Sequence, residues 1–274
     1  MIRGRRVDTW QAPRAYIRLM RRFLYLSLAG GLALLASSSI FALPSLAAGR
    51  LPAGAVSPVT AAKAINIKVA DLPTSIHWLA APAGTSSKAQ VALAQKALAC
   101  LKKVGPVSPD PFGTIGKAGG SVRADVSSPT WYDKASTLTQ LPSVSSEVVF
   151  LNSAAAARSD LSTIGRSGSL ACLTAQLVAN SELQGAGTGI KGTARFLAAP
   201  RHGGGSGGVR IQFIESGGNF ALIKAKLYDN EYFYVQGSAE VAMSFINLNS
   251  SFNTTWSAAS IAKVMARAQA EVKS

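Results

Sequence analysis

The N-terminal part of the chain is its most constraining feature, because it joins a positively charged segment to a long uncharged one. Residues 1–22 contain seven arginines and one acid, Asp8, and residues 23–49 contain no charged side chain. A basic stretch followed by an apolar one is typical of a segment that inserts into a membrane with its basic end left inside. Residues 1–47 are therefore predicted to be a signal peptide or an N-terminal membrane anchor.

Two alternatives are open for this segment, a signal peptide that is cleaved off and a membrane anchor that is not. Ser45 and Ala47 occupy the small-residue positions that a signal peptidase requires, which favours cleavage after Ala47. The uncharged run is also long enough to cross a bilayer, for which about 20 apolar residues suffice, so an uncleaved anchor stays open. No cysteine lies near the cleavage region, which excludes a lipoprotein. In both cases the chain meets the membrane through this segment, and the rest is expected to be extracytoplasmic, secreted or anchored to the outer face of the cytoplasmic membrane.

The charge of the remaining chain limits the choice of partners. Without residues 1–47 the chain keeps 21 basic and 12 acidic residues, a formal net charge of +9. These charges are scattered, and Lys102-Lys103 is the only adjacent basic pair. A nucleic-acid binder concentrates its cations on one face or helix, so no nucleic acid is expected. A scattered positive charge suits a small or polymeric anionic ligand of the cell envelope; a charge that serves only solubility is the alternative.

The chain contains two cysteines, Cys100 and Cys172, whose redox state depends on the compartment in which the protein works. An even number outside the cytoplasm favours one disulfide, which would join two predicted helices. Two separate buried thiols are the alternative. The pair lacks the C-x-x-C spacing of a redox site or a zinc site.

The pattern of apolar residues predicts one α+β domain over residues 71–274, after a Pro- and Ala-rich linker over residues 48–70. Helices are expected over residues 87–104, 153–164, 169–180 and 257–272. Strands are expected over residues 122–126, 147–151, 194–198 and 209–213, and as a hairpin over residues 220–236. This order predicts a mainly antiparallel β-sheet with helices packed on one face.

The hairpin prediction yields the candidate ligand-binding face. A three-residue loop at Asp229-Asn230-Glu231 places the apolar residues on one side, whereas a two-residue loop would exchange the two sides. With the first register, cations and tyrosines share the outward side of one sheet. The members of this face are Arg210, Gln212, Lys224, Lys226, Tyr228, Tyr232 and Tyr234. Such a mixture suits an anionic or sugar-phosphate ligand, and an ordinary solvated sheet face is the alternative.

Two glycine-rich stretches match catalytic or cofactor motifs in letters but not in context. Residues 202–208 (HGGGSGG) contain both a G-x-S-x-G sequence and an oxyanion-type H-G-G-G, but these overlap and a strand follows where a helix is required. Residues 187–192 match G-x-G-x-x-G after a helix and before a strand, the reverse of the dinucleotide-binding order. Both are interpreted as loops, and no cofactor is expected.

The chemistry-bearing side chains form no recognisable catalytic or metal-binding set. His77 and His202 are the only histidines, and nothing near them in sequence completes a triad or a zinc site. The sequence does not exclude a two-carboxylate glycosidase, because folding and not spacing brings such a pair together. We therefore expect no metal and assign no catalytic residue.

Three short stretches carry a resemblance to a known family. They are DLPTSIHW at residues 71–78, ACL at residues 99–101, and SSEVVFLNSAAAARSDLSTIG at residues 145–165 followed by LACL at residues 170–173. Together they resemble the extracytoplasmic PknH-like sensor domain of actinobacterial serine/threonine kinases and of free-standing exported relatives. In the order of its elements the resemblance spans residues 71–270.

The resemblance implies an α+β domain with an antiparallel sheet, a cleft for a ligand and structural disulfides. The family usually has four cysteines, so only a Cys100–Cys172 bridge carries over, and without a kinase any signalling would need a partner. A Mog1/PsbP-like exported domain is a rival. We expect an exported ligand-binding or sensor-type module of the envelope without catalytic activity. An exported hydrolase of envelope polymers and a structural or assembly protein are the alternatives.

Overall fold

The computed structural model describes residues 56–81, 87–113, 121–136, 141–202 and 207–273. The predicted signal peptide or anchor, residues 1–47, lies outside these ranges. Within them, none of the helices combines the length and the apolar character that a membrane span requires.

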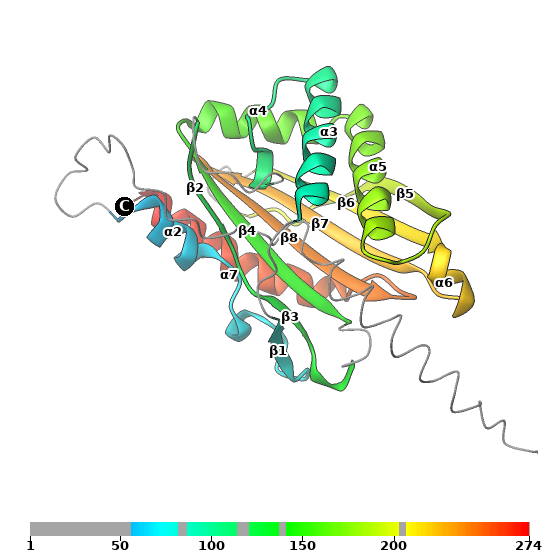
Figure 1. The fold of residues 1–274 in the computed structure, drawn as a ribbon. Coiled ribbons are helices and arrows are strands. Elements are labelled where there is room, and N and C mark those ends of the chain that lie inside the picture. Colours follow the sequence, from blue (N-terminus) through cyan, green and yellow to red (C-terminus); the bar gives the residue numbers. More distant parts are fainter. Residues whose placement is uncertain (1–55, 82–86, 114–120, 137–140, 203–206, 274) are drawn as a thin grey trace, which may run out of the picture.

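One antiparallel sheet of eight strands forms the centre of the fold (Figure 1). Its strand order is β1-β3-β4-β8-β7-β6-β5, and β2 also pairs with β4. The strands are β1 (Trp78–Ala81), β2 (Val122–Ser127), β3 (Thr130–Asp133), β4 (Ser143–Leu151), β5 (Ile190–Leu197), β6 (Gly208–Gly217), β7 (Leu227–Gln236) and β8 (Ala239–Leu248). Strands β4, β8 and β7 lie in the middle and are buried almost throughout, so both of their sides need cover.

Helices supply this cover on both sides of the sheet (Figure 1). The α7 side carries α2 (Pro58–Ile65) and α7 (Thr254–Lys273), and the α5 side carries α3 (Lys88–Val104), α4 (Ala154–Ile164) and α5 (Ser167–Leu183). A short helix, α6 (Gly218–Leu222), connects β6 to β7. The predicted class, a single α+β domain with an antiparallel sheet, is confirmed. The helices, however, lie on two faces and not on one.

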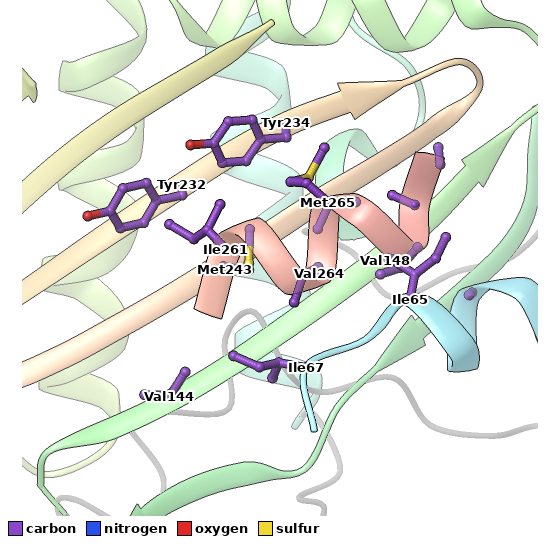
Figure 2. Close-up of a cluster of buried hydrophobic side chains, with 14 of the residues drawn as sticks. Ile65, Ile67, Val144, Val148, Tyr232, Tyr234, Met243, Ile261, Val264 and Met265 are labelled. Atoms are coloured by element: carbon purple, nitrogen blue, oxygen red, sulfur yellow. The ribbon is translucent and has the colours of Figure 1, made fainter. Parts of the chain in front are cut away.

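The core on the α7 side is apolar (Figure 2). The sheet contributes Val144, Val148 and Met243, and α7 contributes Ile261 and Val264, which are all fully buried. These residues recur along α7 at helical spacing and alternate along the strands, which is why one apolar layer forms between them.

The core on the α5 side joins helices to the other side of the same strands. Phe233 and Val235 of β7 point this way because they alternate with Tyr232 and Tyr234. Leu173 of α5 packs against them within one cluster. The helices of this side start where the sequence offers caps. The Ser87 hydroxyl accepts from the Gln90 amide at the start of α3, and Ser153, not Asn152, caps α4.

The predicted linker is wrong for its second half, because residues 58–70 belong to the domain. Pro58 occupies the first turn of α2, where its missing N–H costs nothing, and Ile65 is fully buried in the α7-side core. Arg267 of α7 donates to the carbonyl oxygens of Ile65 and Asn66 and forms an ion pair of 2.6 Å with Asp71. This segment thus contains a packed helix, although its composition is typical of a linker.

The predicted hairpin over residues 220–236 is also wrong. The polar triplet Asp229-Asn230-Glu231 continues β7 as buried strand, and the turn lies at Gly237-Ser238, between β7 and β8. Gly237 has a φ of 57°, a left-handed conformation that favours glycine. The triplet can stay in the sheet because its side chains find polar partners inside the fold.

Candidate functional site

The predicted ligand-binding face is only partly assembled. Arg210, Gln212, Tyr228, Tyr232 and Tyr234 all lie on the α7 side, since β6 and β7 pair Arg210 with Tyr232 and Gln212 with Asn230. Tyr232 and Tyr234, however, are 1% and 0% exposed beneath α7. A ligand on the surface therefore cannot reach the two tyrosine rings.

The two predicted lysines do not join this face. Lys224 and Lys226 are exposed, but they lie between α6 and β7, outside any strand. Lys224 has a φ of 51°, which a residue inside a strand does not adopt. The prediction placed them on the sheet because it treated residues 221–227 as strand.

A polar network remains on this side, on β5, β6 and β7 next to α7. Arg195 donates through Nε (3.0 Å) and Nη2 (2.7 Å) to Oε1 of Gln212. Arg210 donates through Nη2 to Oδ1 of Asn230 at 2.9 Å, and the Gln212 amide donates to Oδ1 of Asn230 (3.2 Å) and to Oγ of Ser251 (3.0 Å). We call these five residues the arginine–amide patch.

The patch holds two guanidinium groups on a rigid base. Gln212 and Asn230 are 2% and 0% exposed, whereas Arg210 is half-buried and Arg195 is exposed. The Arg210 guanidinium lies 5.1 Å from the centre of the Tyr232 ring, and its Nε is buried without a hydrogen-bond partner. Arginines held in this way present donors in a geometry that matches carboxylate or phosphate oxygens.

Sequence reasoning identified Arg210 and Gln212 but missed Arg195 and Asn230. The sequence does contain a signal for Arg195, because Lys191, Thr193 and Arg195 stand at alternate positions. The structure shows that all three are exposed on β5. Asn230 was hidden by its place in a triplet that looks like a turn.

The opposite, α5 side of the sheet carries a feature that the sequence did not reveal. Asp229 and Glu231 are two residues apart on β7 and so point to the same side, where Glu215 of β6 joins them. All three are at most 4% exposed. Oγ of Ser244 donates to Asp229 at 3.0 Å, and Oγ of Ser181 on α5 donates to both carboxyl oxygens of Glu215, at 3.0 and 2.8 Å. We call Glu215, Asp229 and Glu231 the carboxylate row.

Burial keeps protons on this row near neutral pH. Burial, with a smaller contribution from the charge of Asp229, raises the pKa of Glu215 to about 7, against the hydrogen bond from Ser181. Burial likewise raises the pKa of Asp229 to about 6, although hydrogen bonds from Glu231 and Ser244 lower it. The pKa of Glu231 is raised well above its usual range by burial and by its neighbour Asp229. Because the two carboxyl groups lie close together and are buried, the pKa shifts favour a proton on the Asp229–Glu231 pair to a higher pH than on an exposed carboxyl.

A second acidic pair lies on the same side, between β8 and α4. The Phe112 amide donates to Glu240 and the Ser108 amide donates to Asp160, each at 2.7 Å. Burial, followed by the proximity of Asp160, raises the pKa of Glu240 well above its usual range. In the part of the chain that the structure describes, no three His, Cys, Asp or Glu side chains are placed to hold a metal ion.

The histidines lie apart from the carboxylate row. His202 packs edge-on against Tyr234, with ring centres 5.3 Å apart, and burial lowers its pKa. His77 is exposed next to β1. Residues 203–206 of the glycine-rich loop lie outside the described residues, and Gly187 and Gly189 form the connection between α5 and β5.

The predicted disulfide is confirmed. Cys100 of α3 and Cys172 of α5 are bonded, with their Cα atoms 5.7 Å apart and a separation of 72 positions in sequence. The bond joins two of the three helices that cover the α5 side. It is consistent with an oxidising, extracytoplasmic location.

Comparisons with protein-family models, with curated proteins and with solved structures find no match. The geometry of the patch and the row is therefore the basis for the functional proposal.

Proposed function

We propose that the protein is an exported ligand-binding or sensor-type module of the cell envelope, without catalytic activity, and that its arginine–amide patch binds an anionic envelope ligand. The N-terminal segment delivers the domain to the outer face of the cytoplasmic membrane, where it is either released or kept anchored. The observation that carries the proposal is the pair of guanidinium groups held on the buried amides of Gln212 and Asn230.

The patch suits a phosphate or carboxylate group for two reasons. Arg195 and Arg210 retain N–H groups beyond those that the amides accept, because a guanidinium carries five. Within the described ranges neither arginine forms an ion pair, and the acids of β6 and β7 point to the other side of the sheet. Their positive charge is therefore available to an outside anion.

The carboxylate row is the one observation that favours the alternative, an exported hydrolase. Carboxyl groups with raised pKa values can act as general acids. Glu215, Asp229 and Glu231 are 1%, 4% and 4% exposed, however, whereas a general acid must reach the substrate within hydrogen-bond distance. Burial of this extent supports a binding module over a hydrolase.

Binding of anionic probes tests the proposal. The exported protein, in whichever form its cells produce, is titrated with long-chain inorganic polyphosphate, and separately with phosphatidylglycerol vesicles and phosphatidylcholine vesicles. We expect binding to the anionic probes that weakens with salt. The double variant R195Q/R210Q should weaken this binding by about 10-fold or more, since each charged hydrogen bond contributes about 1.5–3 kcal/mol.

A matched variant separates the patch from the general positive charge. Arg158 is exposed on α4, on the α5 side of the molecule, and R158Q removes one cation there. It should leave the affinity nearly unchanged. Equal losses in R158Q and in the single variant R210Q would contradict a defined site and would indicate nonspecific attraction.

A further inference from the structure

The outer edge of β5 is the end of the sheet among the described residues, and a groove of about 490 Å³ runs between it and α5. The helical wall of this groove is formed by Leu170, Ala171, Thr174, Ala175 and Val178, and of these Ala171 and Ala175 are exposed. On the strand, Gly192 allows α5 to approach closely, because a Cβ there would come within 2.6 Å of Val178 and 2.8 Å of Thr174.

An edge strand of this kind can accept another strand. Among the described residues, β5 pairs with β6 alone and no strand occupies its outer edge. β5 is eight residues long (Ile190–Leu197), enough for a ladder of hydrogen bonds. An added strand would alternate its side chains. One set would enter the groove beside Ala171 and Ala175, and the other set would lie on the opposite side of the sheet.

Charge determines which strand fits. On that opposite side, β5 presents Lys191, Thr193 and Arg195, all exposed. Opposite charges across neighbouring strands attract each other and like charges repel. Pairing with β5 of a second copy would bring two Lys191 and two Arg195 side chains to one side, so the charges oppose a dimer through this edge.

We propose that the edge of β5 accepts an extended segment of a partner protein, with acidic residues at alternate positions and small apolar residues between them. The acidic residues pair with Lys191 and Arg195, and the apolar ones fill the groove along α5. This site shares Arg195 with the arginine–amide patch, but it also requires the edge of β5 and the groove along α5, which binding of a small or polymeric anion does not require.

Synthetic peptides test this inference on the exported protein. The probe is a blocked eight-residue peptide of alternating Glu and Val, and its binding is followed by fluorescence anisotropy. Two controls accompany it: a Lys-Val repeat, and a peptide with four Glu followed by four Val. We expect the alternating acidic peptide to bind at least 10-fold more tightly than either control, and to slow amide hydrogen exchange in residues 190–197.

Variants of the protein locate the peptide. A175F fills the groove from an exposed helix position and should weaken binding about 10-fold, whereas A259F, on an exposed position of α7, should not. K191E should weaken it, and K96E on α3 should not. Equal binding of the alternating and block peptides, absence of binding, or an unchanged affinity in A175F would overturn the inference. A dimer in sedimentation that A175F dissociates would overturn it as well, and would assign the groove to a second copy.

Discussion

The two sides of the sheet are built from the same three central strands but differ in the kinds of residue that they bury. On the α7 side, alternate residues of β4, β8 and β7 meet α2 and α7 in an apolar layer (Figure 2). On the α5 side, the residues between them include acids. Of the eight acids that are buried in the described part of the chain, only Asp71 lies on the α7 side, and it has an arginine partner. The members of the other set are Asp110, Glu147, Asp160, Glu215, Asp229, Glu231 and Glu240.

This difference indicates how much each side of the sheet contributes to the stability of the fold. An apolar layer gains free energy in proportion to the area that it removes from water. Buried carboxyl groups lose hydration and stay in the fold only when they are protonated or well hydrogen-bonded. We infer that the α7 side supplies stability, whereas the α5 side needs additional support, which the disulfide between α3 and α5 provides.

Loss of the disulfide should cause the largest change in stability, and this change should affect the α5 side first. In the chain-entropy model, closing a loop of 72 residues stabilises a fold by about 4 kcal/mol. The double variant C100S/C172S should therefore lose about that amount in urea unfolding. Hydrogen exchange should show that α3 and α5 open before α7. An unchanged melting temperature under reducing conditions would contradict the role given to this bond.

The second-largest loss of stability is expected from a cavity in the core on the α7 side. Ile261 is fully buried in the centre of this layer. Since an isoleucine-to-alanine change in a core costs about 2–5 kcal/mol, I261A should lower the free energy of unfolding by about 3 kcal/mol at every pH. The control is A259S on the exposed surface of α7, which should change stability by less than about 0.5 kcal/mol. A small loss in I261A would mean that α7 adds little to the core.

The carboxylate row should make stability depend on pH in an unusual direction. Because the pKa of Glu215 is about 7 in the fold and lower when unfolded, the folded state holds the extra proton between about pH 4.5 and 7. Its contribution is therefore present at low pH and is lost as the pH rises through 7. E215Q should be about 2 kcal/mol more stable than the wild type at pH 8, with little difference at pH 5.

An exposed acid on α5, next to the Ser181 that donates to Glu215, provides the control for this effect. Glu182 of α5 is exposed, so E182Q should not change the slope of stability against pH between 5 and 8. If E215Q and the wild type lost stability in parallel over that range, Glu215 could not be the group that titrates.

The smallest expected effect concerns Asp71, the one buried acid of the α7 side among the described residues. Although burial opposes it, the hydrogen bond and charge of Arg267, together with the Lys68 amide, lower the pKa of Asp71. Its contribution is therefore present above about pH 4, the unfolded value, and is lost as the pH falls through the lower folded value. D71N should cost about 1 kcal/mol at pH 7 and less near pH 3, the opposite trend to Glu215. An equal loss at both values would exclude the ion pair as the cause.

The apolar pattern was sufficient to predict most of the fold. The four long helices, the disulfide and the antiparallel sheet follow from periodicity and cysteine count, because they depend on contacts that recur along the sequence. Two errors share one physical cause. Residues 58–70 and the triplet Asp229-Asn230-Glu231 have the composition of a linker and a turn. Partners distant in sequence, such as Arg267, Ser244 and Gln212, nevertheless hold these segments in the fold.

The candidate site was less predictable for the same reason. Arg210 and Gln212 were found because they alternate on one strand. The register that joins them to Arg195 and Asn230 is set by pairing between strands, and local spacing carries no information about it. Tyr232 and Tyr234 were misplaced because no feature of their own strand shows that α7 covers them.

Native mass spectrometry is the most direct test of the central claim, that the arginine–amide patch makes this chain an anion-binding module of the envelope. The wild type and R195Q/R210Q are purified side by side from the cells or medium that contain the exported protein, and each is measured in native and denatured form. We predict an additional non-covalent mass, of an anionic molecule, on the wild type and its loss from the variant. The same added mass on both proteins, or none on the wild type together with no affinity for polyphosphate, would contradict the claim.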